Sequence, residues 1–164
     1  MITVIDDVFT KTQLEHFREK INYSIKNEPV YKKGEGWHSV YSKHDNEFMC
    51  SQLLAKVGKY FNLQNIQGYD YWTHTNTKPV EWHYDKDEIA YLEGKDRYPV
   101  CSSVFYLEVC GLVNGKLQFK NGVEVKPIEN RLVIFSPRLY HGVEKFEGVR
   151  TSININPWNT KVYK

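Results

Sequence analysis

From about Ile66 onward, the chain is a succession of short alternating or apolar segments separated by turn residues, and this pattern limits the fold more than any other feature. Such segments are typical of half-buried β-strands. Strands are expected near residues 67–74, 79–85, 99–108, 116–120, 122–126, 131–135, 139–145 and 149–156. Asn114-Gly115 and Asn121-Gly122 are turn signals, and strand-like residues flank the second, as a tight hairpin requires. About eight short strands at this spacing favour a sandwich or jelly roll over a parallel sheet.

The first 65 residues predict helical support for these strands. A short apolar strand, Ile2 to Ile5, is followed by Thr10 and Gln13 at the spacing of a capping box. Apolar residues then recur at helical intervals in two segments. The members are Leu14, Phe17, Ile21 and Ile25 in the first segment, and Met49, Leu53, Leu54, Val57 and Phe61 in the second. A polar loop is expected between them, over about 27–46.

The expected fold class is therefore β-rich α+β, a jelly roll with two supporting N-terminal helices. A length of 164 residues suits a single domain, 1–164, with helical support over about 1–65 and a jelly-roll core over about 66–158. The net charge of +2 comes with no basic block, so nucleic acid is not the favoured partner. Neither a secretory leader nor a long apolar run is visible, which predicts a cytoplasmic protein.

The first chemical motif is His83-Tyr84-Asp85 on an expected strand. Residues i and i+2 of a strand project from the same face, so one imidazole and one carboxylate converge there. Six histidines and twenty acidic residues make about one H-x-[DE] match expected by chance. Taken alone, the motif therefore also fits a pair of surface polar residues.

The second element is His141, followed nine positions later by Arg150. A hairpin centred near Lys145-Phe146 would place these two residues almost opposite each other on neighbouring strands. Beyond this point one face of the expected strand is polar, with Arg150, Ser152, Asn154 and Asn156. That face either lies in solvent or lines a polar pocket with a cation at its base, and the pattern alone leaves both interpretations open.

Two imidazoles and one carboxylate on one side of a metal leave open positions, an arrangement suited to iron(II) oxygenases. A 2-oxo acid can chelate such a metal, and a distant carboxylate of the same molecule needs a fixed cation. Arginine matches a carboxylate with two parallel hydrogen bonds and stays charged when buried. Arg150, close in sequence to His141, would satisfy this need.

Between about Tyr69 and Trp158, the order of these motifs resembles the 2-oxoglutarate- and iron(II)-dependent oxygenases of the prolyl-4-hydroxylase-like group. The resemblance is carried by HYD at 83–85, PVCSSVFYL at 99–107, NGKLQF at 114–119, VKPIENRLVIFSPRLYHGV at 125–143 and GVRTSININPW at 148–158. In the family the third motif begins with two glycines, whereas this chain has Asn114 at the first. Asn tolerates the left-handed backbone conformation, so the turn is expected to survive.

The resemblance implies a double-stranded β-helix with His83, Asp85 and His141 as iron ligands. It implies Arg150 as the anchor for the side-chain carboxylate of 2-oxoglutarate, with Tyr106 and Ser152 as further contacts to that group. The implied cofactors and co-substrates are Fe(II), 2-oxoglutarate and O2, with ascorbate in a supporting role.

The implied activity is hydroxylation of a C–H bond in a peptidyl substrate, proline among the candidates, or in an amino-acid-like small molecule, with release of succinate and CO2. Two alternatives stay open: a cupin-like metal-binding protein and a non-catalytic jelly-roll binding module. Segments 86–97 and 27–46 are expected either to cover the substrate or to be plain connectors. Trp72, His74 and Trp82 lie near the metal motif and are candidates for shaping the pocket.

Overall fold

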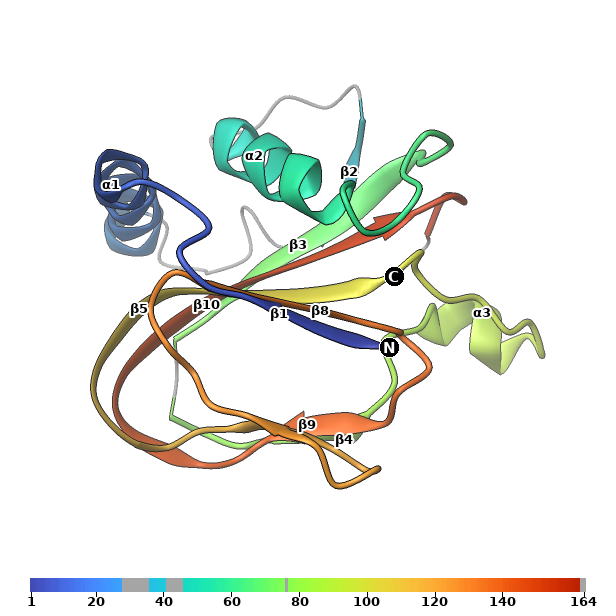
Figure 1. Cartoon of the computed structure of the whole chain (residues 1–164). Coiled ribbons are helices and arrows are strands. Elements are labelled where there is room, and N and C mark those ends of the chain that lie inside the picture. Colours follow the sequence, from blue (N-terminus) through green and yellow to red (C-terminus); the bar gives the residue numbers. More distant parts are fainter. Residues whose placement is uncertain (28–35, 41–45, 76, 163–164) are drawn as a thin grey trace.

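Two antiparallel sheets face each other in the computed structural model, which describes residues 1–27, 36–40, 46–75 and 77–162 (Figure 1). The larger sheet has the strand order β1-β8-β5-β10-β3-β2, and the smaller has the order β4-β9-β6-β7. The larger sheet comprises β1 (Ile2–Ile5), β2 (Gly36–Ser39), β3 (Gly68–His74), β5 (Ser102–Asn114), β8 (Arg131–Phe135) and β10 (Phe146–Trp158). The smaller sheet comprises β4 (Val80–His83), β6 (Leu117–Phe119), β7 (Glu124–Val125) and β9 (His141–Val143).

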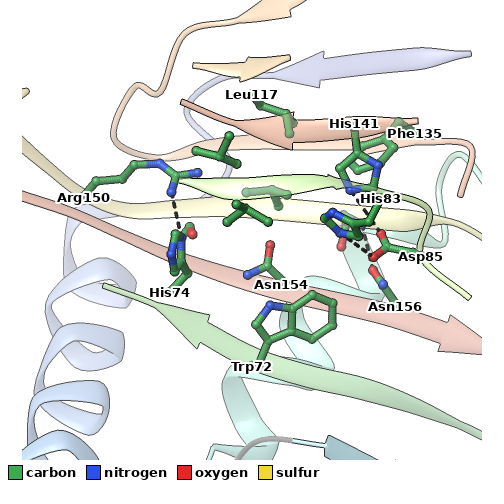
Figure 2. Close-up of a pocket in the computed structure, with 15 residues that line it drawn as sticks. Trp72, His74, His83, Asp85, Leu117, Phe135, His141, Arg150, Asn154 and Asn156 are labelled. Atoms are coloured by element: carbon green, nitrogen blue, oxygen red, sulfur yellow. Dashed lines mark hydrogen bonds and ion pairs between the residues drawn. The ribbon is translucent and has the colours of Figure 1, made fainter. Parts of the chain in front are cut away.

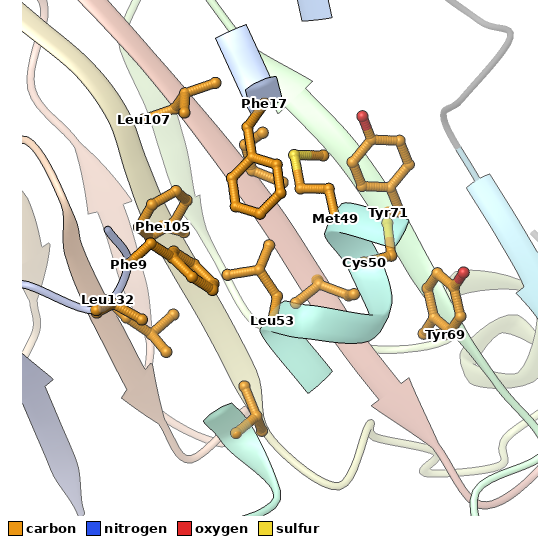
Figure 3. Close-up of a cluster of buried hydrophobic side chains, with 14 of the residues drawn as sticks. Phe9, Phe17, Met49, Cys50, Leu53, Tyr69, Tyr71, Phe105, Leu107 and Leu132 are labelled. Carbon is orange, nitrogen blue, oxygen red and sulfur yellow. The ribbon is translucent and has the colours of Figure 1, made fainter. Parts of the chain in front are cut away.

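Helices α1 (Lys11–Asn27) and α2 (Glu47–Val57) lie on the face of the larger sheet that points away from the smaller one (Figure 1). The expected capping box is present, because Gln13 N–H donates to Thr10 Oγ1 at 3.3 Å and Thr10 N–H donates to Gln13 Oε1 at 3.0 Å. Phe17 of α1 and Leu53 of α2 are fully buried in an apolar cluster with Phe105 of the sheet (Figure 3). Burial of this apolar surface holds the helices on the sheet.

The alternation of side chains along the strands produces two cores. In β5, Phe105 and Leu107 belong to the cluster under the helices, whereas Val104 and Tyr106 belong to a second cluster that includes residues of both sheets. Successive strand residues point to opposite faces, so a strand covered on both sides contributes side chains to both clusters. The larger sheet is therefore the middle layer of the molecule.

The eight expected strands of the core are all present as β3 to β10, with β5 and β10 longer than predicted at 13 residues each. Two elements were not expected. Strand β2 lies within the predicted polar loop and pairs with β3, and helix α3 (Glu88–Leu92) lies within the segment 86–97. The side chain of Asp87 caps α3 by accepting a hydrogen bond from Ala90 N–H at 3.0 Å. The proposed cover over 27–46 falls largely on residues outside those described.

The hairpin predicted near Lys145-Phe146 was wrong. Strand β9 pairs with β4 and β6 in the smaller sheet, whereas β10 pairs with β3 and β5 in the larger one, so the chain crosses between sheets at this point. Glu147-Gly148, a turn-prone pair of residues, lies inside β10, where the register with β5 is irregular. Gly148 has φ +94° and its backbone lies directly against Gly111, so the glycine permits close strand contact instead of a turn.

Two turns agree with their sequence signals. Asn114 has φ +65° and Gly115 has φ +82°, so the turn survives the loss of the family's first glycine, as expected. Gly122, with φ +87°, donates its N–H to Phe119 O at 2.9 Å and closes the β6–β7 hairpin. Among the described residues, no helix combines the length and apolar character needed to cross a bilayer.

Candidate metal centre and the pocket behind it

His83, Asp85 and His141 come together at one end of the smaller sheet. His83 of β4 and His141 of β9 are direct cross-strand partners, and their ring centroids are 4.4 Å apart. Asp85 follows two residues after His83 and lies between the two rings, with its carboxylate oxygens 3.5 Å from His83 Nε2 and 3.7 Å from His141 Nε2. One potential ligand atom from each residue lies within 4.8 Å of the other two. A single divalent cation could bind all three side chains.

The second nitrogen of each imidazole fixes the proton position. His83 Nδ1 lies 2.7 Å from Glu81 O, and His141 Nδ1 lies 2.8 Å from Leu139 O. A carbonyl oxygen only accepts hydrogen bonds, so both Nδ1 atoms carry the proton. In the neutral imidazole this leaves the Nε2 lone pair directed at the shared site. Histidine ligands of metals are commonly held by such backbone acceptors.

Electrostatics keep the carboxylate charged at this site. Burial would raise the pKa of Asp85, but the hydrogen bond with His83 and the charge of His141 outweigh it and lower the pKa to about 2. The hydrogen bond with Asp85 raises the pKa of His83, whereas burial lowers the pKa of His141. Asp85 therefore offers an anionic oxygen to the shared site.

Behind this cluster, a pocket extends between the two sheets (Figure 2). One wall is the polar face of β10, since Arg150, Ser152, Asn154 and Asn156 all line the pocket and all are buried. The same pocket includes His83, Asp85 and His141. The structure thus decides between the two interpretations of the alternating strand, because the polar face points inward and not into solvent.

Arg150 occupies the other end of the pocket (Figure 2). Its side chain is 2% exposed, and its Nη1 donates to His74 Nδ1 at 3.1 Å. The guanidinium lies 5.1 Å from the ring centroid of Tyr106 and 5.4 Å from that of Phe146. Within the described part of the chain, no carboxylate forms an ion pair with Arg150, and its Nε has no hydrogen-bond partner. A buried cation without a counter-ion is costly, so this group is suited to an anionic ligand.

Tyr106 lies against this cation, and Ser152 lines the same pocket. Tyr106 is fully buried, and among the described residues its hydroxyl has no hydrogen-bond partner. Burial raises the pKa of Tyr106, and the nearby Arg150 opposes the rise. Ser152 lines the pocket and is the register partner of Tyr106 on one side and of His74 on the other.

Sequence patterns gave His74 and the two asparagines no defined role. Asn156 accepts a hydrogen bond from Ser103 N–H at 3.2 Å through Oδ1, which sets the orientation of its amide. Its Nδ2 is buried without a partner in the described structure, and Figure 2 shows the side chain at the metal end of the pocket. The inward alternation of β10 was the available signal for the asparagines, whereas nothing local to His74 indicated its contact with Arg150.

Other residues proposed to shape the pocket gave mixed outcomes. Trp72 lines it, but Trp82 lies on the other face of β4, 40% exposed and stacked on Tyr140 with ring centroids 5.9 Å apart. The segment 86–97 contributes no side chain to the pocket wall. The expectation for Trp82 was therefore wrong, because the period of a strand places it opposite His83.

No protein-family model and no curated protein sequence matches the chain. Solved structures do. A prolyl-4-hydroxylase from Pseudomonas putida aligns with a TM-score of 0.67 at 15% identity, covering 98% of this chain and 93% of that one. HygX from Streptomyces hygroscopicus, with nickel and 2-oxoglutarate bound, aligns with a TM-score of 0.63 at 15% identity, covering 99% and 85%.

A third similar structure is a prolyl hydroxylase from Trichoplax adhaerens, in complex with a peptide fragment of the hypoxia inducible factor oxygen degradation domain. It aligns with a TM-score of 0.63 at 12% identity, covering 96% of this chain and 83% of that one. At these identities the likeness establishes a shared fold. The resemblance to the prolyl-4-hydroxylase-like group is confirmed at that level.

Proposed function

We propose that this chain, which has the fold of the prolyl-4-hydroxylase-like proteins, is a 2-oxoglutarate- and iron(II)-dependent dioxygenase that hydroxylates a C–H bond. We further propose that residues 1–164 form one such domain and that the two facing sheets are those of a double-stranded β-helix. The observation that carries the proposal is that a His-Asp-His cluster and a buried arginine without an acidic partner, among the described residues, line one pocket.

The residues present fit an iron(II) ion. His83 and His141 direct Nε2 at the shared site, and Asp85 adds a charged oxygen, which is the two-histidine, one-carboxylate ligand set of iron(II) oxygenases. When bound there, iron(II) supplies the activation of O2 and the oxidation of the C–H bond. The protein's own task is to hold the reactants in place and to keep water out of the pocket.

The residues also fit 2-oxoglutarate. This molecule has a 2-oxo acid group that can chelate a metal and a second carboxylate at its other end. In the proposed complex, Arg150 binds the second carboxylate, and the Tyr106 hydroxyl and Ser152 add hydrogen bonds to it. Binding of this carboxylate would explain why, among the described residues, the buried Arg150 has no acidic partner and the buried Tyr106 hydroxyl has no hydrogen-bond partner.

In the proposed reaction, one atom of O2 enters the substrate as a hydroxyl group. The other enters succinate, and CO2 is released from 2-oxoglutarate. The proposed substrates are a peptidyl residue, proline first among them, or an amino-acid-like molecule. The peptide bound to the similar Trichoplax structure supports the first class. The Asn156 Nδ2 donor at the metal end of the pocket suits a carbonyl oxygen of either class.

Arg150 also separates this function from its two alternatives. A cupin-like metal protein or a non-catalytic binding module needs no carboxylate anchor at the far end of the pocket. Both alternatives predict that 2-oxoglutarate is neither bound nor consumed. Measuring its binding and turnover therefore distinguishes them from the proposed dioxygenase.

The test is succinate formation by purified protein with iron(II), 2-oxoglutarate and O2, screened across prolyl peptides and free amino acids. We expect succinate to form, and Asp85→Ala to reduce it to background. Asp96→Ala, which removes an exposed acid away from the metal cluster, should retain wild-type formation. Absence of even substrate-independent turnover, or full activity of the Asp85→Ala protein, would contradict the proposal.

A further inference from the structure

The contact between His74 and Arg150 assigns a defined state to His74. Arg150 Nη1 lies 3.1 Å from His74 Nδ1, and a guanidinium can only donate hydrogen bonds. His74 Nδ1 must therefore be the acceptor and cannot carry a proton. This is the opposite of His83 and His141, whose Nδ1 atoms donate to backbone carbonyls.

The surroundings of the guanidinium leave one of its edges available. Its flanks are taken by the rings of Tyr106 and Phe146, and Nη1 is held by His74. In the described structure, Nη1 donates its hydrogen bond to His74, and the buried Nε has no hydrogen-bond partner. The Nε–H and Nη2–H groups lie side by side on one edge of the plane, and a carboxylate can accept from both at once.

His74 is itself well placed to hold this orientation. It is the last residue of β3 and the direct register partner of Ser152, two residues from Arg150 on β10. Its ring packs edge-on against Phe146 with centroids 6.4 Å apart, and Phe146 also contacts the guanidinium. Histidine, phenylalanine and arginine therefore restrain one another.

We propose that His74 is a positioning residue whose unprotonated Nδ1 sets the rotation of the Arg150 guanidinium, so that its Nε–Nη2 edge meets the distal carboxylate of 2-oxoglutarate. This inference rests on the proposed function, because it concerns the same co-substrate. It adds a residue that touches neither the metal cluster nor the reacting carbon, and it acts only on ligands that have a second carboxylate.

Three substitutions separate positioning from general packing. In His74→Asn the amide oxygen lies where Nδ1 lies in histidine, so the acceptor is kept. In His74→Gln the amide oxygen lies one bond further out, and in His74→Leu there is no acceptor. The Asn and Gln variants have the same functional group, so their comparison stays informative if the Leu variant fails to fold.

Each iron(II)-loaded protein is titrated without O2, once with 2-oxoglutarate and once with 2-oxobutanoate, while the absorbance of the iron–2-oxo acid chelate is followed. The two probes share the chelating group, but 2-oxobutanoate has no distal carboxylate. We expect His74→Leu and His74→Gln to weaken 2-oxoglutarate binding by about tenfold and His74→Asn by less than about threefold. Binding of 2-oxobutanoate should be the same in all four proteins.

The other results overturn the inference in distinguishable ways. Equal 2-oxoglutarate affinity in the Asn, Gln and Leu variants, or an equal loss for both probes, would show that His74 does not position Arg150 while leaving the proposed function intact. If wild-type protein bound iron(II) but not 2-oxoglutarate, the proposed function and this inference would both fail.

Discussion

The two ends of the pocket use the same side chain in opposite ways. At the metal end, His83 and His141 donate through Nδ1 to carbonyl oxygens, so Nε2 can bind a cation. At the far end, His74 accepts through Nδ1 from Arg150. The metal end belongs to the smaller sheet and the segment after β4, whereas the far end belongs to β3, β5 and β10 of the larger sheet.

This difference shows that the hydrogen-bond partner of Nδ1 determines the role that a histidine side chain can take. A histidine whose Nδ1 donates to a backbone carbonyl can bind a metal through Nε2. A histidine whose Nδ1 accepts from a cation holds that cation in place. The two ends should therefore respond independently to substitution, with one affecting metal affinity and the other co-substrate affinity. Four substitutions test this independence.

The largest effect is expected for His141→Gln, which removes a metal ligand that is 5% exposed. Iron(II) affinity should fall by at least about a hundredfold. His74→Gln is the matched control at the other end, and it should leave iron(II) affinity unchanged. Competition with a chromogenic chelator measures both. If the two variants lost metal affinity to the same extent, the division between the two ends would be wrong.

Arg150→Met should weaken 2-oxoglutarate binding by about a hundredfold, because it removes a charge-assisted pair of hydrogen bonds. Iron(II) affinity should be retained. The same substitution should leave the free energy of unfolding of the ligand-free protein unchanged or increase it by about 1–3 kcal/mol, because it removes a buried charge that has no described counter-ion.

Anaerobic titration and urea denaturation measure these two quantities. Arg138→Met, at an exposed arginine, is the control. A strongly destabilised Arg150→Met protein would mean that the charge is compensated within the protein and is not kept for a ligand.

Tyr106→Phe removes a buried hydroxyl that has no partner among the described residues. We expect 2-oxoglutarate affinity to fall by about five- to tenfold, whereas the stability of the ligand-free protein should not decrease. Affinity for 2-oxobutanoate, followed in parallel, should not change. An unchanged affinity for 2-oxoglutarate would remove Tyr106 from the carboxylate site.

The smallest effect is expected for Ser152→Ala. Ser152 lines the pocket between the two ends, and loss of one neutral hydrogen bond should weaken 2-oxoglutarate binding by about threefold. Metal affinity should be the same as in wild-type protein. If the affinity for iron(II) fell more than the affinity for 2-oxoglutarate, Ser152 would not belong to the carboxylate site.

Much of the fold and of the site could be predicted, because a few consecutive residues of a strand show which side chains share a face. The alternation of polar and apolar residues along β10 and the H-x-D motif at the end of β4 are visible in short windows of sequence. The crossing between β9 and β10 was missed because glycine is found both in turns and where two strands come into close contact. Gly148 is in a close strand contact.

Partners distant in the chain could not be predicted by such windows. His74 and Arg150 are separated by 76 positions, and only the pairing of β3 with β10 brings them together. Helix α3 was missed for a different reason. Five residues are too few to display a helical period, and its start depends on one side-chain cap from Asp87.

The polar face of β10 runs along the pocket, from Arg150 at one end to Asn156 at the metal end (Figure 2). Alternate residues of a strand are spaced about 6.6 Å apart, and β10 is held in register by β3 on one side and β5 on the other. The backbone of one strand thus sets the gap between metal and arginine, and no loop needs to adjust it. Moving the arginine by one alternate position along β10 would shift the preference between 2-oxo diacids of different chain length without altering the metal ligands.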